Sequence, residues 1–299
     1  MNSGAVDEPT PLEIEIPGHR IAGLRWHADR RGPLVLALHG WLDNAASFAS
    51  LAPGLERAQL VAVDLPGHGR SSHKAVGCCY HFVDAVADAA AVLEALSDRE
   101  VVLLGHSMGA GISTLLAGMW PERIAGVCLV EGLGPLTDDE SNAPSRLAAS
   151  VAAQRRHATD RRRVFPDLSA AAQRLELAQD VGEQAAYMLA TRGTESVDGG
   201  LRWRADPRLR VPSRIRFTEA QVLAFIRAIK APVRLIRARD GFSFDEATMR
   251  ARVQAAARLQ VVEVDGGHHV HLDHPERVLP VLQALVDELV STPSDPPSA

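Results

Sequence analysis

The chain begins with a short alternation of apolar and polar residues and then changes to longer, almost purely apolar runs. Leu12, Ile14 and Ile16 alternate with two glutamates before a Pro-Gly turn, which predicts a β-hairpin with one face in water. The later apolar runs span 33–40, 58–67, 100–107, 124–132, 232–238 and 259–266. Strands that are apolar on both faces are typical of a parallel sheet with helices on each side.

The segments between these runs show helical periodicity. Residues 81–97 place apolar side chains along one stripe, and the segment from Pro275 repeats them at i, i+3, i+4, i+7, i+8 and i+11. Strand and helix in alternation predict an open α/β sheet. Between about 136 and 228 no strand-like run occurs, and the pattern indicates short helices and turns.

This pattern predicts how the chain is divided. We expect a helical lid at 136–228, inserted after the strand that ends at Glu131. The remaining parts are expected to be a core of 10–135 and 229–292 and disordered tails at 1–9 and 293–299.

Composition excludes several classes of partner. With 299 residues and 46% apolar content the chain can bury a sizeable core, and its net charge of −5 gives no general attraction to nucleic acid or anionic membranes. No run approaches the roughly 18 apolar residues of a membrane span. Three cysteines form no disulfide framework and the N-terminus does not resemble a signal peptide, so we expect a cytoplasmic protein. The oligomeric state does not follow from these data.

The expected lid is basic although the chain is acidic. Between Arg146 and Arg216 there are fourteen arginines and eight acidic residues. This excess fits a solvated helical surface. It also fits a lid that attracts anionic substrates, such as carboxylates or phosphorylated thioesters.

The strongest candidate for chemistry is Ser107. The segment 105–109 reads G-H-S-M-G and lies between an apolar run and a small-residue helix, the context that a nucleophile elbow requires. A turn this tight leaves no room for side chains two residues before or after the serine. The helix that follows supplies free amides and a dipole that favour a developing oxyanion.

Four motifs together resemble the α/β-hydrolases over roughly residues 10–292: HGW at 39–41, DLPGHGRS at 64–71, the elbow at 105–109 and Gly-His at 267–268. The chain is most similar to the serine hydrolase-like subgroup, whose natural substrates are poorly defined. The resemblance implies an oxyanion hole formed by the backbone amides of Trp41 and Met108. Haloalkane dehalogenases and epoxide hydrolases have aspartate where this chain has Ser107, which disfavours both of those activities.

The segment GGHHVHLDHPE at 266–276 permits two interpretations. His269, His271, Asp273 and His274 fit the H-x-H-x-D-H zinc signature of metallo-β-lactamases. The same segment matches the α/β-hydrolase pattern in which His268 is the catalytic base. Only 25 residues follow His274 and none is histidine, so the zinc motif lacks the later ligands that it needs. We therefore expect His268 to be the base, with no metal or cofactor, and keep a structural or adventitious metal as the alternative.

The triad acid must lie between Ser107 and His268 in the chain. Glu131 ends an apolar strand and is similar to the triad glutamate of some haloalkane dehalogenases. Asp240 follows a later strand, but its motif is one residue shorter than the usual G-x-x-D, a shift of more than about 3 Å along an extended chain. We favour Glu131, keep Asp240 as the alternative and regard Asp245 as remote.

These residues predict a serine hydrolase that cleaves a small-molecule carboxylic ester through an acyl-enzyme. The same triad could also act on thioesters, lactones or carbon–carbon bonds. The sequence is further compatible with an acyltransferase and, more remotely, with a metal-dependent hydrolase that uses the histidine cluster or with a non-catalytic binding protein. The natural substrate cannot be named, because the expected lid determines it.

Overall fold

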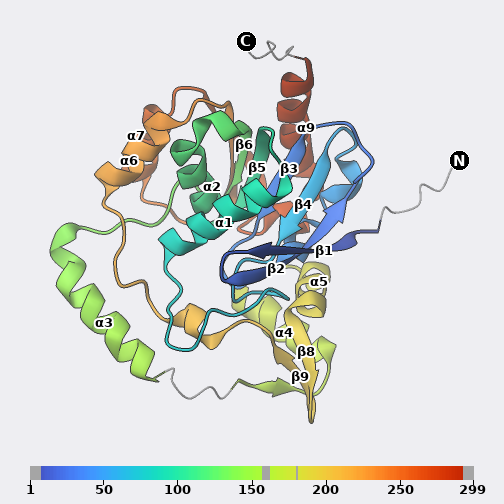
Figure 1. The fold of residues 1–299 in the computed structure, drawn as a ribbon, viewed down its shortest axis with the longest axis vertical. Coiled ribbons are helices and arrows are strands. Elements are labelled where there is room, and N and C mark those ends of the chain that lie inside the picture. The colour runs from blue at the N-terminus through green and yellow to red at the C-terminus, as the bar shows by residue number, and fades with distance from the viewer. Residues whose placement is uncertain (1–7, 157–161, 180, 292–299) are drawn as a thin grey trace, which may run out of the picture.

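The structure is a computed structural model, which describes residues 8–156, 162–179 and 181–291. The tails expected at 1–9 and 293–299 lie outside these residues, apart from Glu8 and Pro9. A mixed sheet of eight strands forms the centre, in the order β1-β2-β4-β3-β5-β6-β10-β11 (Figure 1). Its strands are β1 (Thr10–Ile16), β2 (His19–Trp26), β3 (Leu34–Leu38), β4 (Gln59–Val63), β5 (Val101–His106), β6 (Ile124–Val130), β10 (Val233–Asp240) and β11 (Leu259–Gly267).

The sheet confirms the strands predicted from the apolar pattern. β1 and β2 form the antiparallel hairpin, and β2 also pairs antiparallel with β4. All other neighbours pair in parallel. The inner strand β5 is buried along its whole length, whereas β11 lies at the edge and has no fully buried residue.

Helices cover both faces of the sheet, as an α/β architecture requires. Leu36 and Leu38 of β3 pack in one cluster with α1 (Phe82–Leu96), α2 (Met108–Met119), α6 (Glu219–Ala228) and α7 (Glu246–Ala255). Val35 and Ala37 of the same strand face the opposite way and pack with α8 (Val270–Asp273) and α9 (Pro275–Ser291). Figure 1 shows α1 and α2 in front of the strands. Within the described ranges, no helix is long and apolar enough to cross a membrane.

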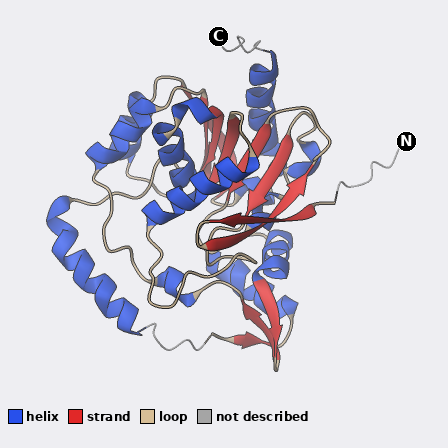
Figure 2. Cartoon of the chain, viewed as in Figure 1, coloured by secondary structure: helices blue, strands red, loops and turns tan. Residues whose placement is uncertain are grey.

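The segment 136–228 contains more than helices and turns, which corrects the expectation from its sequence. It holds α3 (Ala143–Arg156), α4 (Leu168–Gln179) and α5 (Glu183–Gly193), and also a small antiparallel sheet in the order β7-β9-β8. The strands β7 (Val164–Phe165), β8 (Thr194–Val197) and β9 (Gly200–Trp203) are too short to show a two-residue alternation. Figure 2 shows this sheet below the central one, and α3 lies along the outer edge of the molecule.

Candidate active site

Ser107 lies at a sharp turn between β5 and α2. Its backbone adopts φ 50° and ψ −110°, a region that residues with a side chain rarely occupy. A Cβ on Gly105 would lie 2.6 Å from the Ala110 backbone, and one on Gly109 would lie 1.9 Å from the Leu38 carbonyl oxygen. The turn can therefore form only with glycine at both positions, and the surrounding strands hold the strained serine in place.

The structure brings Ser107, His268 and Glu131 together from three separate parts of the chain. Ser107 Oγ lies 2.9 Å from His268 Nε2. The other ring nitrogen, Nδ1, lies 3.2 Å from Glu131 Oε2. A hydroxyl, an imidazole and a carboxylate in this series can transfer the serine proton and stabilise the imidazolium that results.

Glu131 follows β6, and its carboxylate is held firmly at the strand end. The side chain is 1% exposed, and it accepts hydrogen bonds of 2.7 Å from the amides of Ala238 and Phe242. The backbone of Glu131 turns away from the strand at φ 58°. The approach of the chain at Gly241 is so close that a Cβ there would lie 2.1 Å from Glu131 Oε2.

The other candidate acids are not brought to His268. Asp240 is exposed at the end of β10, and within the described part of the chain it makes no hydrogen bond to His268. Asp245 accepts a bond of 2.7 Å from the amide of Thr248 and caps α7. Capping a helix is an ordinary role for a surface aspartate such as Asp245.

The two amides expected to bind an oxyanion lie at the same cavity as Ser107. Met108 is the first residue of α2, so its N–H has no partner within the helix. Trp41 lies in the loop after β3. The backbone amides of Trp41 and Met108 donate no hydrogen bond to another described residue. The Trp41 indole donates to the Leu209 carbonyl at 3.1 Å, which joins this loop to segment 136–228.

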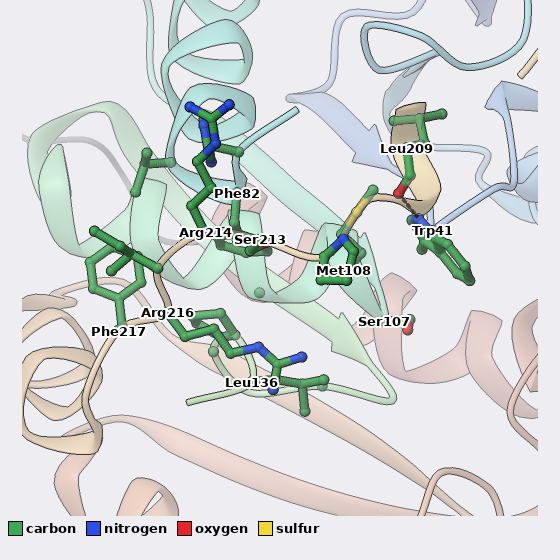
Figure 3. Close-up of a pocket in the computed structure, with 18 of the residues that line it drawn as sticks. Trp41, Phe82, Ser107, Met108, Leu136, Leu209, Ser213, Arg214, Arg216 and Phe217 are labelled. Atoms are coloured by element: carbon green, nitrogen blue, oxygen red, sulfur yellow. Dashed lines mark hydrogen bonds between the residues drawn. The ribbon is translucent and has the colours of Figure 1, made fainter. Parts of the chain in front are cut away.

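A cavity of about 790 Å³ opens beside Ser107 (Figure 3). Its walls are largely apolar and include Phe82, Leu136, Val211, Phe217, Phe242 and Phe244. Segment 136–228 and the loops after β6 and β10 contribute most of the lining. The cavity is large enough for a substrate of moderate size, and its aromatic and aliphatic walls suit an apolar group.

Two of the three arginines in the cavity wall differ in their contacts. Arg214 donates to Gln154 Oε1 at 2.8 Å and to Cys79 Sγ at 3.1 Å. Arg216 lies beside Leu136 in Figure 3 and has no ion pair or hydrogen bond to another described residue. Partial desolvation and the neighbouring charge of Arg146 lower the pKa of Arg216. Its guanidinium is therefore available to an anionic ligand.

A cluster of buried histidines lies behind His268. The ring of His106 donates from Nε2 to the carbonyl oxygen of His268 at 2.9 Å. Burial lowers the pKa of His106 to about 4. Asp43 is also buried; burial alone would raise its pKa, but the imidazoles of His106 and His269 hold this pKa well below its ordinary value. His269 keeps a raised pKa despite burial, because Asp43 favours its protonated form.

The H-x-H-x-D-H residues do not converge on a common point. His271 Nε2 lies 3.0 Å from Ser47 Oγ, Asp273 accepts from the Gly182 amide at 3.0 Å, and His274 is half-exposed beside Glu276. Only His269 of the motif joins a group with metal-ligand spacing in the described chain, and its companions there are Asp43 and His106. Sequence reasoning missed these two. Two features of the sequence could have indicated them: Asp43 is a charged residue in the HGWLDN loop, and His106 is a histidine inside the elbow motif.

Comparison with known proteins identifies the family. A model of the α/β hydrolase fold matches residues 33–275. A serine hydrolase-like protein of Danio rerio is 32% identical over 91% of this chain and 86% of its own length. A hypothetical protein of Pseudomonas aeruginosa PAO1 has a solved structure with a TM-score of 0.86 and 39% identity, covering 94% of this chain and 99% of that one. The chain therefore belongs to the α/β hydrolase fold family.

A further solved structure is the thioesterase domain from the curacin biosynthetic pathway. It is 28% identical to this chain, has a TM-score of 0.81, and the match covers 95% of this chain and 99% of that one. Proteins that resemble this chain over nearly their whole length thus include a thioesterase.

Proposed function

We propose that this protein is a serine hydrolase that cleaves carboxylic esters, with Ser107 as nucleophile, His268 as base and Glu131 as triad acid. The observation that carries the proposal is the continuous series Ser107 Oγ–His268–Glu131, with contacts of 2.9 and 3.2 Å beside an apolar cavity. The resemblance to serine hydrolase-like proteins supports the same chemistry.

In the proposed mechanism, His268 Nε2 takes the hydroxyl proton of Ser107 as Oγ attacks the carbonyl carbon of the substrate. The amides of Trp41 and Met108 stabilise the negative oxygen of the tetrahedral intermediate. His268 then donates the proton to the departing alcohol, and a water molecule repeats the two steps on the acyl-enzyme. These steps need no metal and no cofactor.

Glu131 serves this mechanism better than Asp240. Its carboxylate is buried, and three donors fix it, namely the amides of Ala238 and Phe242 and His268 Nδ1–H. A fixed charge at Nδ1 selects the tautomer with a free lone pair at Nε2 and stabilises the imidazolium. The exposed carboxylate of Asp240 would lack this orientation.

The experiment that tests this proposal is hydrolysis of p-nitrophenyl acetate and butyrate in the presence of a fluorophosphonate or, separately, of EDTA. We expect the fluorophosphonate to abolish hydrolysis and label Ser107, and EDTA to have no effect. Hydrolysis that EDTA abolishes and zinc restores, with Ser107 unlabelled, would instead support a metal-dependent hydrolase.

The same cavity supports a preference for anionic esters with an apolar chain. Residues 136–228 would act as the lid that selects the substrate, and Arg216 is a cation in the cavity wall with no partner among the described residues. Arg216 is exposed, and a carboxylate that pairs with an exposed guanidinium contributes up to about 1 kcal/mol, equivalent to roughly threefold to fivefold in affinity.

This preference is tested with the p-nitrophenyl half-ester of adipic acid against p-nitrophenyl hexanoate. We expect Arg216→Gln to raise KM for the half-ester about threefold to fivefold and leave KM for the hexanoate unchanged. Arg163→Gln is the matched control, because Arg163 is exposed in the same segment and does not line the cavity. Equal effects on the two esters would refute the preference.

A further inference from the structure

Asp43, His106 and His269 form a second cluster of polar side chains, which the proposed hydrolysis does not use. Each offers one ligand atom, and these atoms all lie within 4.8 Å of one another. The side chains are at most 5% exposed. Asp43 comes from the loop after β3, His106 from the end of β5 and His269 from the loop after β11, so that three separate segments converge there.

The hydrogen-bond pattern around His106 leaves a lone pair that faces the Asp43 carboxylate with no hydrogen between them. The carbonyl oxygen of His268 can only accept, so Nε2 of His106 carries the hydrogen of that 2.9 Å bond. In the neutral ring Nδ1 then has a lone pair, and it lies 3.4 Å from Asp43 Oδ2. A lone pair and a carboxylate oxygen repel each other unless a cation lies between them.

The two distances from Asp43 are too long for hydrogen bonds and close to those between neighbouring ligands of a metal ion. Asp43 Oδ2 lies 3.4 Å from His106 Nδ1 and 3.6 Å from His269 Nε2, beyond the ordinary N–H···O range of about 2.7–3.2 Å. Around a tetrahedral zinc ion with bonds of about 2.0–2.1 Å, neighbouring ligand atoms lie about 3.3–3.4 Å apart. Among the described residues, neither carboxylate oxygen of Asp43 nor His106 Nδ1 has a hydrogen-bond partner.

The surroundings also fit a metal centre. The bond from His106 Nε2 to a backbone carbonyl is the kind of outer contact that orients a metal-binding histidine. The site is kept open by Gly40, where a Cβ would lie 2.8 Å from both Asp43 Oδ2 and His106 Nδ1. Two imidazoles and one carboxylate are ligands that suit zinc and related divalent transition metals.

We propose that Asp43, His106 and His269 form a binding site for a divalent transition-metal ion of the zinc class, behind the loop that carries His268. The ion supplies the positive charge between the carboxylate and the two imidazoles. His106 also donates to the His268 carbonyl, so the ion lies beside the loop that carries the base but takes no part in the proposed hydrolysis. None of the three ligands belongs to the proposed triad, although His106 and His269 are sequence neighbours of Ser107 and His268, so the existence of the site does not depend on the proposed hydrolysis.

The test uses the full chain, stripped of metal with a chelator and titrated with Co²⁺ or Zn²⁺. We expect one Co²⁺ per chain with the intense visible bands of a tetrahedral centre, and a thermal unfolding midpoint that rises with the concentration of Zn²⁺. His269→Gln and Asp43→Asn are each expected to weaken binding at least about tenfold. His274→Gln is the matched control, because this half-exposed histidine of the same segment lies outside the cluster and its replacement should leave binding unchanged.

Circular dichroism of each variant separates loss of the site from loss of the fold. X-ray absorption of the zinc-loaded wild type needs no variant, and we expect two imidazoles and oxygen at about 2.0–2.1 Å. The proposal is overturned if no Co²⁺ bands appear, if binding survives both ligand substitutions, or if His274→Gln removes it, since the last result would mean adventitious binding at the surface.

Discussion

Replacement of Glu131 by glutamine is the perturbation that the structure specifies most sharply. The two carboxylate oxygens accept from three donors: the Ala238 amide on Oε1, and the Phe242 amide with His268 Nδ1 on Oε2. A glutamine side chain keeps the shape but turns one acceptor into a donor. Its amide group must therefore face at least one N–H at a site where the side chain is 1% exposed.

The size of the effect follows from the two possible orientations of the glutamine. With its nitrogen toward Ala238, the bond to His268 survives, but the negative charge that stabilises the imidazolium is gone. With its nitrogen toward His268, the ring is forced into the tautomer that protonates Nε2, and this tautomer cannot accept the Ser107 proton. Removal of the charge on a triad acid lowers kcat by about 10⁴-fold, or roughly 5.4 kcal/mol of transition-state stabilisation. One unsatisfied buried amide also lowers the free energy of unfolding by about 1–3 kcal/mol.

The assay is kcat for p-nitrophenyl butyrate, with urea unfolding of the same samples. We expect Glu131→Gln to lose about 10³–10⁴-fold in kcat and to stay folded. Asp240→Asn is the matched control at an exposed position and is expected to stay within about twofold of the wild type, as surface substitutions usually do. A nearly active Glu131→Gln protein together with an inactive Asp240→Asn protein would refute this reasoning and make Asp240 the triad acid.

Further predictions concern the surroundings of the site. Gly241→Ala would bring a Cβ to 2.1 Å from Glu131 Oε2, so we expect kcat to fall at least about tenfold with little change in KM. An unchanged kcat would show that the loop can shift to accommodate the added methyl group. Arg192→Met leaves Asp64 without its buried ion-pair partner at 2.8 Å and should lower the free energy of unfolding by about 3 kcal/mol, read from urea unfolding; an unchanged midpoint would contradict this. Burial raises the pKa of Cys128 to about 12, so a thiol reagent at neutral pH should leave this residue unmodified until the protein is unfolded, while the other two cysteines react.

The central sheet could be predicted from the sequence because its strands are long and apolar on both faces. Each of these runs is recognisable without knowledge of its neighbours, and strand–helix alternation then fixes a parallel arrangement. The sheet of β7, β8 and β9 could not be predicted in this way. Its strands have two to four residues, and β7 gains its pairing only from residues near Leu201, far along the chain.

The candidate site shows the same limit. Ser107 and His268 each lie in a local motif, and the structure brings them to 2.9 Å. The choice between Glu131 and Asp240 depends on which strand end lies beside His268, and spacing along the chain does not determine this. Asp43 and His106 were missed for a related reason, since neither belongs to a metal-binding spacing until the fold places them beside His269.

The central claim, an acyl-enzyme on Ser107, is tested most directly by rapid mixing with p-nitrophenyl butyrate, an acid quench and mass spectrometry of the peptide that contains Ser107. The account predicts a burst of about one p-nitrophenol per chain, a butyryl group on Ser107, and the loss of both in Ser107→Ala. Turnover without a burst, with Ser107 unmodified and with the Ser107→Ala protein still active, would contradict it.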